Sequence, residues 1–150
     1  VGTIAFLVSL LVLLLWFFLD QKIGIGTVIN FIIIAIMIDF TIFFFKTPET
    51  FFFQFFFIVV GVLLVGFGTA MYLIANLGAG PRDGLMTGLQ KKTKAPIALV
   101  RVAIEIVVVL LGWSLGGIVG IGTVLYAFGI GPAVALFLFF FSKKIRYFFP

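Results

Sequence analysis

Five long apolar runs, each bounded by polar residues, glycine or proline, occupy most of this 150-residue chain. A hydrocarbon core about 30 Å thick requires about 20 apolar residues per helix, and the runs are of that order. They cover approximately residues 3–19, 27–45, 51–75, 97–113 and 121–141. The sequence therefore predicts an all-α polytopic membrane protein with five transmembrane helices.

Composition supports this class and excludes several others. Hydrophobic residues make up 64% of the chain and charged residues only 10%, whereas a soluble domain carries about 25% charged residues. The chain has no cysteine and no histidine, which excludes disulfides, cysteine metal sites and imidazole ligands. We expect no metal and no cofactor. The expected partner is a lipid bilayer rather than nucleic acid, because no soluble basic surface is predicted.

The basic residues are distributed unequally between the two predicted faces of the membrane. With five spans, one face carries eight of them outside the spans, and the opposite face carries only Lys46. The eight are Lys22, Arg82, Lys91, Lys92, Lys94, Lys143, Lys144 and Arg146. Because cytoplasmic loops are enriched in lysine and arginine, this asymmetry predicts a cytoplasmic C-terminus.

The pentapeptide GIGTV occurs twice, at 24–28 and at 120–124. Upstream of each copy a leucine-rich run ends in tryptophan, at Trp16 and at Trp113. Glycine-rich apolar segments can match by chance, but five consecutive identities with an aligned tryptophan favour an internal duplication. Three predicted spans separate the copies, and this odd number gives them opposite orientations, as in inverted-repeat transporters.

We accordingly expect a three-plus-three inverted-repeat bundle that lacks its first helix in this chain. Residues 1–50 would be the last two helices of the first repeat, and residues 51–150 the complete second three-helix repeat. The two parts would form one membrane domain, with a further span preceding Val1. Binding sites in such folds lie at the interface between the repeats.

Several motifs carry a resemblance that extends over essentially the whole chain. They are LGAGPRDGL at 77–85, KKTK at 91–94, RVAIE at 101–105 and the second GIGTV. On these motifs the sequence resembles the YczE-type bacterial membrane proteins, relatives of the YitT group. The resemblance implies a multi-pass protein of the bacterial inner membrane with a transport role. It also implies that the family's other segment, of Gly-x-Gly-Pro-Trp-Asp type, would precede Val1.

The strongest candidate site is the glycine- and proline-rich segment 78–84. Its candidate substrate-binding residues are Gly78, Gly80, Pro81, Arg82 and Asp83. The glycines and the proline prevent a continuous helix, and the backbone left unpaired must meet protein, water or a ligand. A short helix over 84–90, capped by Asp83, would present its N-terminus beside Arg82 and favour an anionic or carbonyl-bearing solute. The alternative is a cytoplasmic turn that Arg82 and Asp83 only cap and solvate.

Three further ionisable residues fall inside predicted spans, where a charge costs at least about 2.5 kcal/mol on insertion scales. They are Asp39, Arg101 and Glu105. Arg101 and Glu105 share one helical face and suit either a polar pathway or a self-neutralised structural ion pair. Arg101 is also shallow enough to extend to the headgroups. Asp39 has no partner adjacent in sequence, so it must face the bundle interior, pair with another group or stay protonated, and it is a further candidate for the binding site.

The two GIGTV segments are interpreted as sites of close helix packing. Their small residues are Gly24, Gly26, Thr27, Gly120, Gly122 and Thr123. Small residues let helices approach closely, and threonine hydroxyls cap helices or bond across them. A nucleotide-binding loop is excluded because no lysine completes a phosphate-binding motif. The two tryptophans are expected to be interfacial anchors at opposite membrane faces.

Three function classes compete. The repeat, the broken segment and the buried charges favour a secondary transporter or permease for an unidentified small solute. A non-transporting membrane scaffold or accessory subunit is the alternative, and a homo-oligomer is open in either case. An intramembrane enzyme is disfavoured, and we expect no catalytic residue, because no cysteine, histidine or Ser-Lys arrangement supplies a nucleophile with its base. Only Asp39 with Glu105 offers a carboxylate pair.

Overall fold

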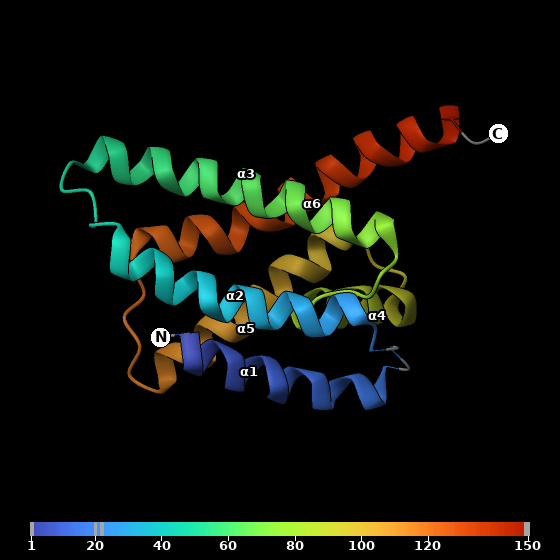
Figure 1. The fold of residues 1–150 in the computed structure, drawn as a ribbon, viewed down its shortest axis with the longest axis horizontal. Coiled ribbons are helices and arrows are strands. Elements are labelled where there is room, and N and C mark those ends of the chain that lie inside the picture. Colours follow the sequence, from blue (N-terminus) through green and yellow to red (C-terminus); the bar gives the residue numbers. More distant parts are fainter. Residues whose placement is uncertain (1, 20, 22, 149–150) are drawn as a thin grey trace.

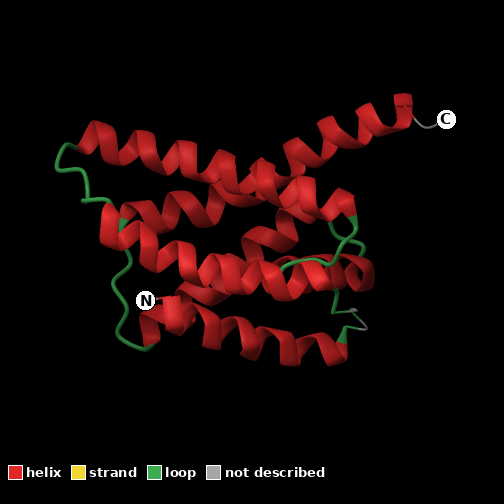
Figure 2. Ribbon diagram, viewed as in Figure 1, coloured by secondary structure: helices red, strands yellow, loops and turns green. Residues whose placement is uncertain are grey.

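Helices form all the regular structure in the residues that the computed structural model describes, 2–19, 21 and 23–148 (Figure 2). For 143–148 only the backbone is described. Lys22 and the side chains of Lys143, Lys144 and Arg146, which enter the predicted charge asymmetry, lie outside the described residues.

Each helix begins or ends where glycine, proline or a polar residue interrupts an apolar run. α3 ends at Asn76, which adopts the left-handed conformation with φ of 53°, and Pro96 directly precedes α5. The helices are α1 (Gly2–Leu15), the 3-10 helix η1 (Trp16–Phe18), α2 (Ile25–Phe44), α3 (Phe51–Ala75), α4 (Pro81–Thr93), α5 (Ile97–Ser114) and α6 (Ile121–Phe148). The sequence therefore predicted the long helices to within about two residues at most ends, apart from the C-terminal end of α6.

Four described helices are long and apolar enough to cross a membrane: α2, α3, α5 and α6 up to Ser142. The predicted first span is not among them, because it is shorter than the 18 residues required of such a helix. It consists of α1 and η1 together, Gly2–Phe18, which rise about 27 Å at 1.5 Å per α-helical and 2.0 Å per 3-10 residue. The helix leaves α geometry at Trp16, where the indole binds a distant carbonyl. Length and composition thus support an all-α membrane protein with four long spans in the described part, where five were predicted.

The helices divide into two groups in space. α1 packs mainly against α2, whereas α3 and α5 pack mainly against α6, and the short α4 contacts both α1 and α5. Following the colours of Figure 1 from the N-terminus shows that α2 and α6 run in opposite directions, as do α1 and α5. The helices that carry matching sequence are therefore antiparallel.

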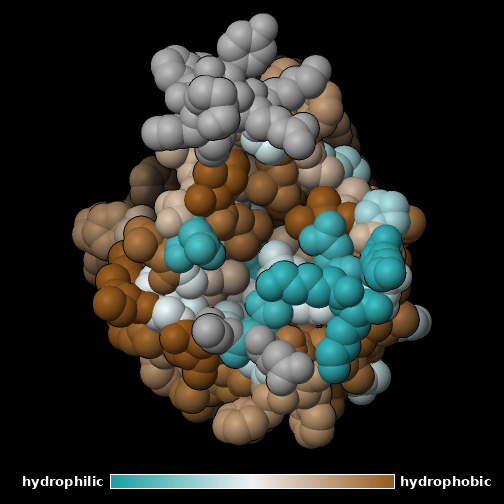
Figure 3. All heavy atoms as spheres, turned by 90° about the vertical axis from the view of Figure 1, so that its right-hand side faces the viewer, coloured by the Kyte–Doolittle hydropathy of each residue, from teal (hydrophilic) through white to brown (hydrophobic). Residues whose placement is uncertain are grey.

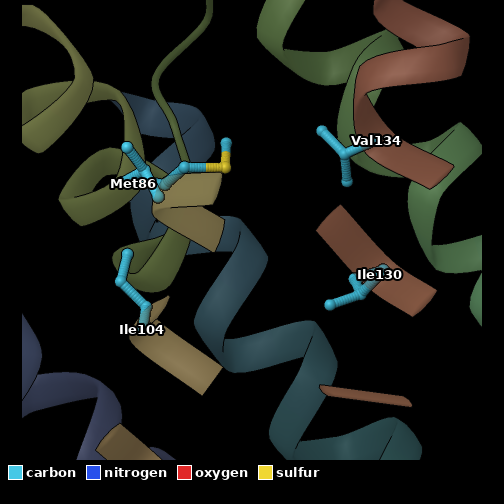
Figure 4. Close-up of a cluster of buried hydrophobic side chains, with 5 residues drawn as sticks. Met86, Ile104, Ile130 and Val134 are labelled. Carbon is cyan, nitrogen blue, oxygen red and sulfur yellow. The ribbon is translucent and has the colours of Figure 1, made fainter. Parts of the chain in front are cut away.

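Small residues and one apolar cluster hold the second group together. The buried cluster consists of Met86 from α4, Val100 and Ile104 from α5, and Ile130 and Val134 from α6 (Figure 4). Around it the helices approach closely, because a Cβ placed on Gly66 of α3 would lie 2.8 Å from the Cβ of Ala133 in α6. In lipid, such close van der Waals contact is a main source of helix association.

Replacing Gly131 by alanine is expected to destabilise the contact between α5 and α6. The added Cβ would lie 2.5 Å from the carbonyl oxygen of Ala98, and overpacking of this kind costs about 1–3 kcal/mol. The matched control is Gly61→Ala in α3, where a Cβ meets no described atom within 4 Å. Both changes gain about 1 kcal/mol of helix propensity, so the difference in stability between the two variants reports the packing contribution alone. Thermal unfolding in detergent micelles measures it, and equal midpoints for the two variants would contradict this packing.

Candidate functional site

Between α3 and α4 the chain turns back into the bundle instead of continuing along its end. The N–H of Gly26 in α2 donates a hydrogen bond of 2.9 Å to the carbonyl of Leu77, and a Cβ on Gly80 would lie 2.5 Å from Oδ1 of Asn30. Residues 77–80 therefore run inward alongside the start of α2. They reach the level of Asn30, which lies about 8 Å along the helix from Ile25 at 1.5 Å per residue. Figure 1 shows this segment running back along α2. We call residues 76–80 the re-entrant segment.

Gly24 and Gly78 make this close approach feasible. A Cβ on Gly24 would lie 2.5 Å from the Leu77 carbonyl oxygen, and one on Gly78 would lie 2.9 Å from the Cα of Gly24. Gly78 also has φ of 114°, a conformation that favours glycine. Thr27, fully buried beside them, accepts a 3.2 Å hydrogen bond from the N–H of Gly24. The first GIGTV segment thus packs closely, and its partner is the re-entrant segment.

The second GIGTV segment has a different environment in the described chain. A Cβ on Gly120 would meet no described atom within 4 Å, and one on Gly122 would lie 3.1 Å from the Cδ1 of Ile58. Thr123 is half-buried. Close packing by Gly120, Gly122 and Thr123 therefore stays a prediction.

α4 begins three residues earlier than predicted, which changes the role of Asp83. Pro81 is its first residue and Gly80 its N-cap, with no side-chain cap. The prediction that Asp83 caps the helix is wrong: Asp83 lies in the first turn, and its carboxylate faces α5. Proline is favoured at the first helical position because its missing N–H would have no partner there, and this signal was available in the sequence.

Trp16 fixes the start of α4 from the side of α1. Its indole Nε1–H donates a 2.9 Å hydrogen bond to the carbonyl of Pro81, and its ring occupies the space that a side chain on Gly84 would need. About three turns further along α4 from Pro81, Lys92 donates to the carbonyl of Phe18. The expectation that Trp16 is an interfacial anchor is wrong, since only 2% of it is exposed. Trp113 is 65% exposed.

Four charged side chains from α4 and α5 form one ion-pair cluster. Arg101 Nη1 lies 2.5 Å from Oδ1 of Asp83, and its Nη2 lies 3.1 Å from Oε1 of Glu105. Arg82 Nη1 approaches Oε2 of Glu105 at 3.5 Å. Arg101 is 3% exposed, so it does not extend to the headgroups as the sequence allowed. The Arg101–Glu105 pair expected from the spacing is present, and Asp83 joins it from another helix.

A cavity of about 780 Å³ lies beside this cluster, between the α1–α2 group and the rest of the molecule. All six α-helices contribute to its wall. Its polar lining consists of Ser9, Asn30, Thr69, Tyr72, Arg82, Asp83, Arg101 and Tyr126. Asn30, Tyr72 and Tyr126 were not predicted as site residues. Each is an isolated polar residue inside an apolar run, which is the signal that could have identified them.

Asp39 lies apart from the cluster. It lines a separate, open cleft of about 330 Å³ with Gly2, Thr3 and Phe6, and its Oδ1 accepts a 2.7 Å hydrogen bond from the N–H of Gly2. It is exposed rather than directed into the bundle, and it does not line the larger cavity. The structure therefore does not bring Asp39 together with Glu105.

Comparison with known proteins confirms the resemblance predicted from the motifs. A family model described as "Family of unknown function (DUF6198)" matches residues 1–138. A Haemophilus influenzae protein named "Uncharacterized protein" is 46% identical over 138 residues, which are 92% of this chain and 63% of that protein. The Bacillus subtilis "Uncharacterized membrane protein YczE" is 37% identical over 103 residues, 69% of this chain and 48% of that protein. No solved structure matches.

The chain thus spans between about half and two thirds of the length of these relatives. The relative that is a membrane protein, together with the long apolar helices, assigns the chain to a membrane.

Replacing Arg101 by methionine is expected to reduce the free energy of unfolding by about 3–5 kcal/mol, because Asp83 and Glu105 would remain buried without their common partner. Adding Asp83→Asn and Glu105→Gln to the same variant should recover much of this loss. The control is Lys91→Met on the exposed part of α4, where surface changes stay within about 0.5 kcal/mol. Chemical unfolding in micelles provides the comparison. An Arg101→Met variant as stable as the control would show that the cluster is not a buried ionic network.

Proposed function

We propose that this chain, which belongs to the DUF6198 family, is a secondary transporter or permease that moves a small solute through the cavity beside the Arg101 cluster. One observation carries the proposal: three charged side chains, Arg82, Asp83 and Arg101, line a large cavity in an apolar bundle, at the point where the non-helical re-entrant segment ends and α4 begins. Non-helical backbone at membrane depth is tolerated only where protein buries it or where it lines a water-filled cavity. In known transporters, broken segments of this kind form the solute site.

The proposed architecture is the three-plus-three inverted repeat, with α1 and η1 serving as a short fifth span. The opposite directions of α2 and α6, and of α1 and α5, support it (Figure 1). So does the position of the cavity between the α1–α2 group, which falls in residues 1–50, and the helices of residues 51–150. A site between two halves allows access to alternate as the halves move against each other.

The proposed location is the bacterial inner membrane, with the C-terminus in the cytoplasm. Figure 3 views the end of the bundle at which α4 finishes, where hydrophilic side chains gather within a largely apolar surface. Lys91, Lys92 and Lys94 are exposed on this part of α4. By the positive-inside rule this is the cytoplasmic end. We propose transport without chemical conversion of the solute, since the site contains no nucleophile paired with a base.

Single cysteines test the proposal without knowledge of the solute, because the chain has none of its own. A transporter predicts that Asn30→Cys, in the cavity wall, reacts with a membrane-impermeant thiol reagent in both right-side-out and inverted vesicles. Lys91→Cys serves as the reference and should react from the cytoplasmic side only.

Filling the cavity should slow this reaction. Gly68 lines the cavity, and a Cβ on it meets no described atom within 4 Å, so Gly68→Leu is expected to add side-chain volume to the cavity. Gly61→Leu on the same helix, outside the cavity, is the matched control. Labelling of Asn30→Cys from one side only, or at a rate that Gly68→Leu leaves unchanged, would favour the non-transporting scaffold.

A further inference from the structure

The cavity changes from polar to apolar along its length. On α2 its wall contains Asn30, Ile34 and Ile38, one residue per helical turn. On α3 it contains Tyr72 and Thr69 towards the re-entrant segment and Val65 one turn further away. Both helices therefore place their polar residues at the end near α4. The distance from Asn30 to Ile38 is about 12 Å at 1.5 Å per residue.

α1 continues the apolar end of the cavity. Its lining residues include Ile4, Ala5 and Val8. Because the N-terminal end of α1 lies against the C-terminal half of α2, as the hydrogen bond from Gly2 to Asp39 indicates, these residues lie at the level of Ile34 and Ile38. α1, α2 and α3 thus all contribute apolar residues to the end of the cavity that lies away from α4.

At the polar end, two of the buried polar atoms without a hydrogen-bond partner belong to groups that can donate, whereas the third, Oε1 of Glu105, lies 3.1 Å from Nη2 of Arg101. Among the described residues, neither the hydroxyl of Tyr72 nor Nε of Arg101 has a hydrogen-bond partner, although both atoms are buried. The side chain of Arg82 is 40% exposed, and its contact with Glu105 is long, at 3.5 Å. A buried donor without a partner is destabilising, so a ligand that supplies an acceptor is favoured here.

The charges at this end favour an anionic acceptor over a cationic group. Both carboxylates of the cluster face Arg101, which leaves Arg82 as the charged group with the most freedom to meet a ligand. A planar guanidinium binds a carboxylate through two parallel hydrogen bonds. A cationic head would lie beside the exposed guanidinium of Arg82, whereas Asp83 and Glu105 are already paired with Arg101.

We propose that the solute is a small amphiphilic carboxylate, whose head binds Arg82 and Tyr72 and whose aliphatic tail lies along Ile34, Ile38 and Val65. This inference rests on the proposed transport site and specifies its ligand. The cavity volume of about 780 Å³ is within the usual range of about 300–1,000 Å³ for small-ligand sites. The apolar end, about two turns long, selects a short tail and excludes a purely ionic solute.

The test compares four probes with the full-length protein in lipid nanodiscs: octanoate, octanol, octylammonium and acetate. Binding is followed by isothermal titration, with empty nanodiscs subtracted to remove partition into lipid. We expect octanoate to bind more tightly than the other three. Arg82→Gln should weaken octanoate binding about ten-fold or more and leave octanol unchanged, because it removes a charged hydrogen bond. Lys91→Gln, which makes the same charge change on the exposed part of α4, should have no effect.

Two further variants separate an effect on octanoate binding from an effect on folding. Tyr72→Phe removes one hydroxyl and should weaken octanoate while leaving the unfolding temperature close to that of the wild type. Gly68→Leu should weaken octanoate and octanol alike, because it fills the cavity that both tails would occupy.

The outcomes distinguish this inference from the function on which it rests. Octanol or octylammonium binding as tightly as octanoate, or octanoate binding that Arg82→Gln does not change, would overturn the carboxylate head. Binding of acetate as tight as that of octanoate would overturn the tail. If no probe binds while Asn30→Cys is still labelled from both sides, the solute class is wrong and the transport proposal stands. If labelling is one-sided, the transport proposal fails first.

Discussion

The non-helical backbone of the re-entrant segment is hydrogen-bonded to the first turn of α2 inside an apolar bundle. The positions of the other site residues depend on that pairing. The first N–H groups of a helix have no partner within it, and in a membrane they must find one in the protein. Gly26 finds the carbonyl of Leu77, and the glycines at 24 and 78 bring the two backbones within contact distance. The first GIGTV segment is therefore explained by a backbone-to-backbone fit rather than by helix crossing alone.

This fit determines where the charges lie. Because the chain enters the bundle along α2, α4 begins at Pro81 within the protein, and Arg82 and Asp83 face α5. The cluster contains two arginines and two carboxylates, so it is neutral as a whole when all four are ionised. A buried ionic cluster adds little stability compared with an apolar core, but leaving one partner unpaired is costly. Its arrangement beside a cavity is what the proposed solute site requires.

The sequence predicted the elements that depend on local chemistry. Apolar run length located α3 at 51–75, in agreement with the structure, and the helix-interrupting residues indicated a break after it, although the break ends at Gly80 rather than at Gly84. The sequence did not predict contacts between distant elements, because no local sequence pattern indicates which distant residues will pack together. Trp16 donates a hydrogen bond to a carbonyl 65 residues away, and it is buried although it was expected at the interface. Tyr72 and Tyr126 were likewise not predicted as site residues and join the cavity wall through tertiary packing, as does the contact of Asp83 with Arg101.

A disulfide between α2 and the re-entrant segment tests the central claim most directly, in a chain that has no other cysteine. A Cβ on Gly80 would lie 3.1 Å from the Cγ of Asn30, and disulfides require Cβ atoms about 3.5–4.5 Å apart. Re-entry predicts that Asn30→Cys with Gly80→Cys cross-links rapidly in membranes under mild oxidation, whereas Asn30→Cys with Lys94→Cys, at the outer end of α4, does not. Rapid cross-linking of the Lys94 pair, or none of the Gly80 pair, would show that residues 76–80 remain at the end of the bundle.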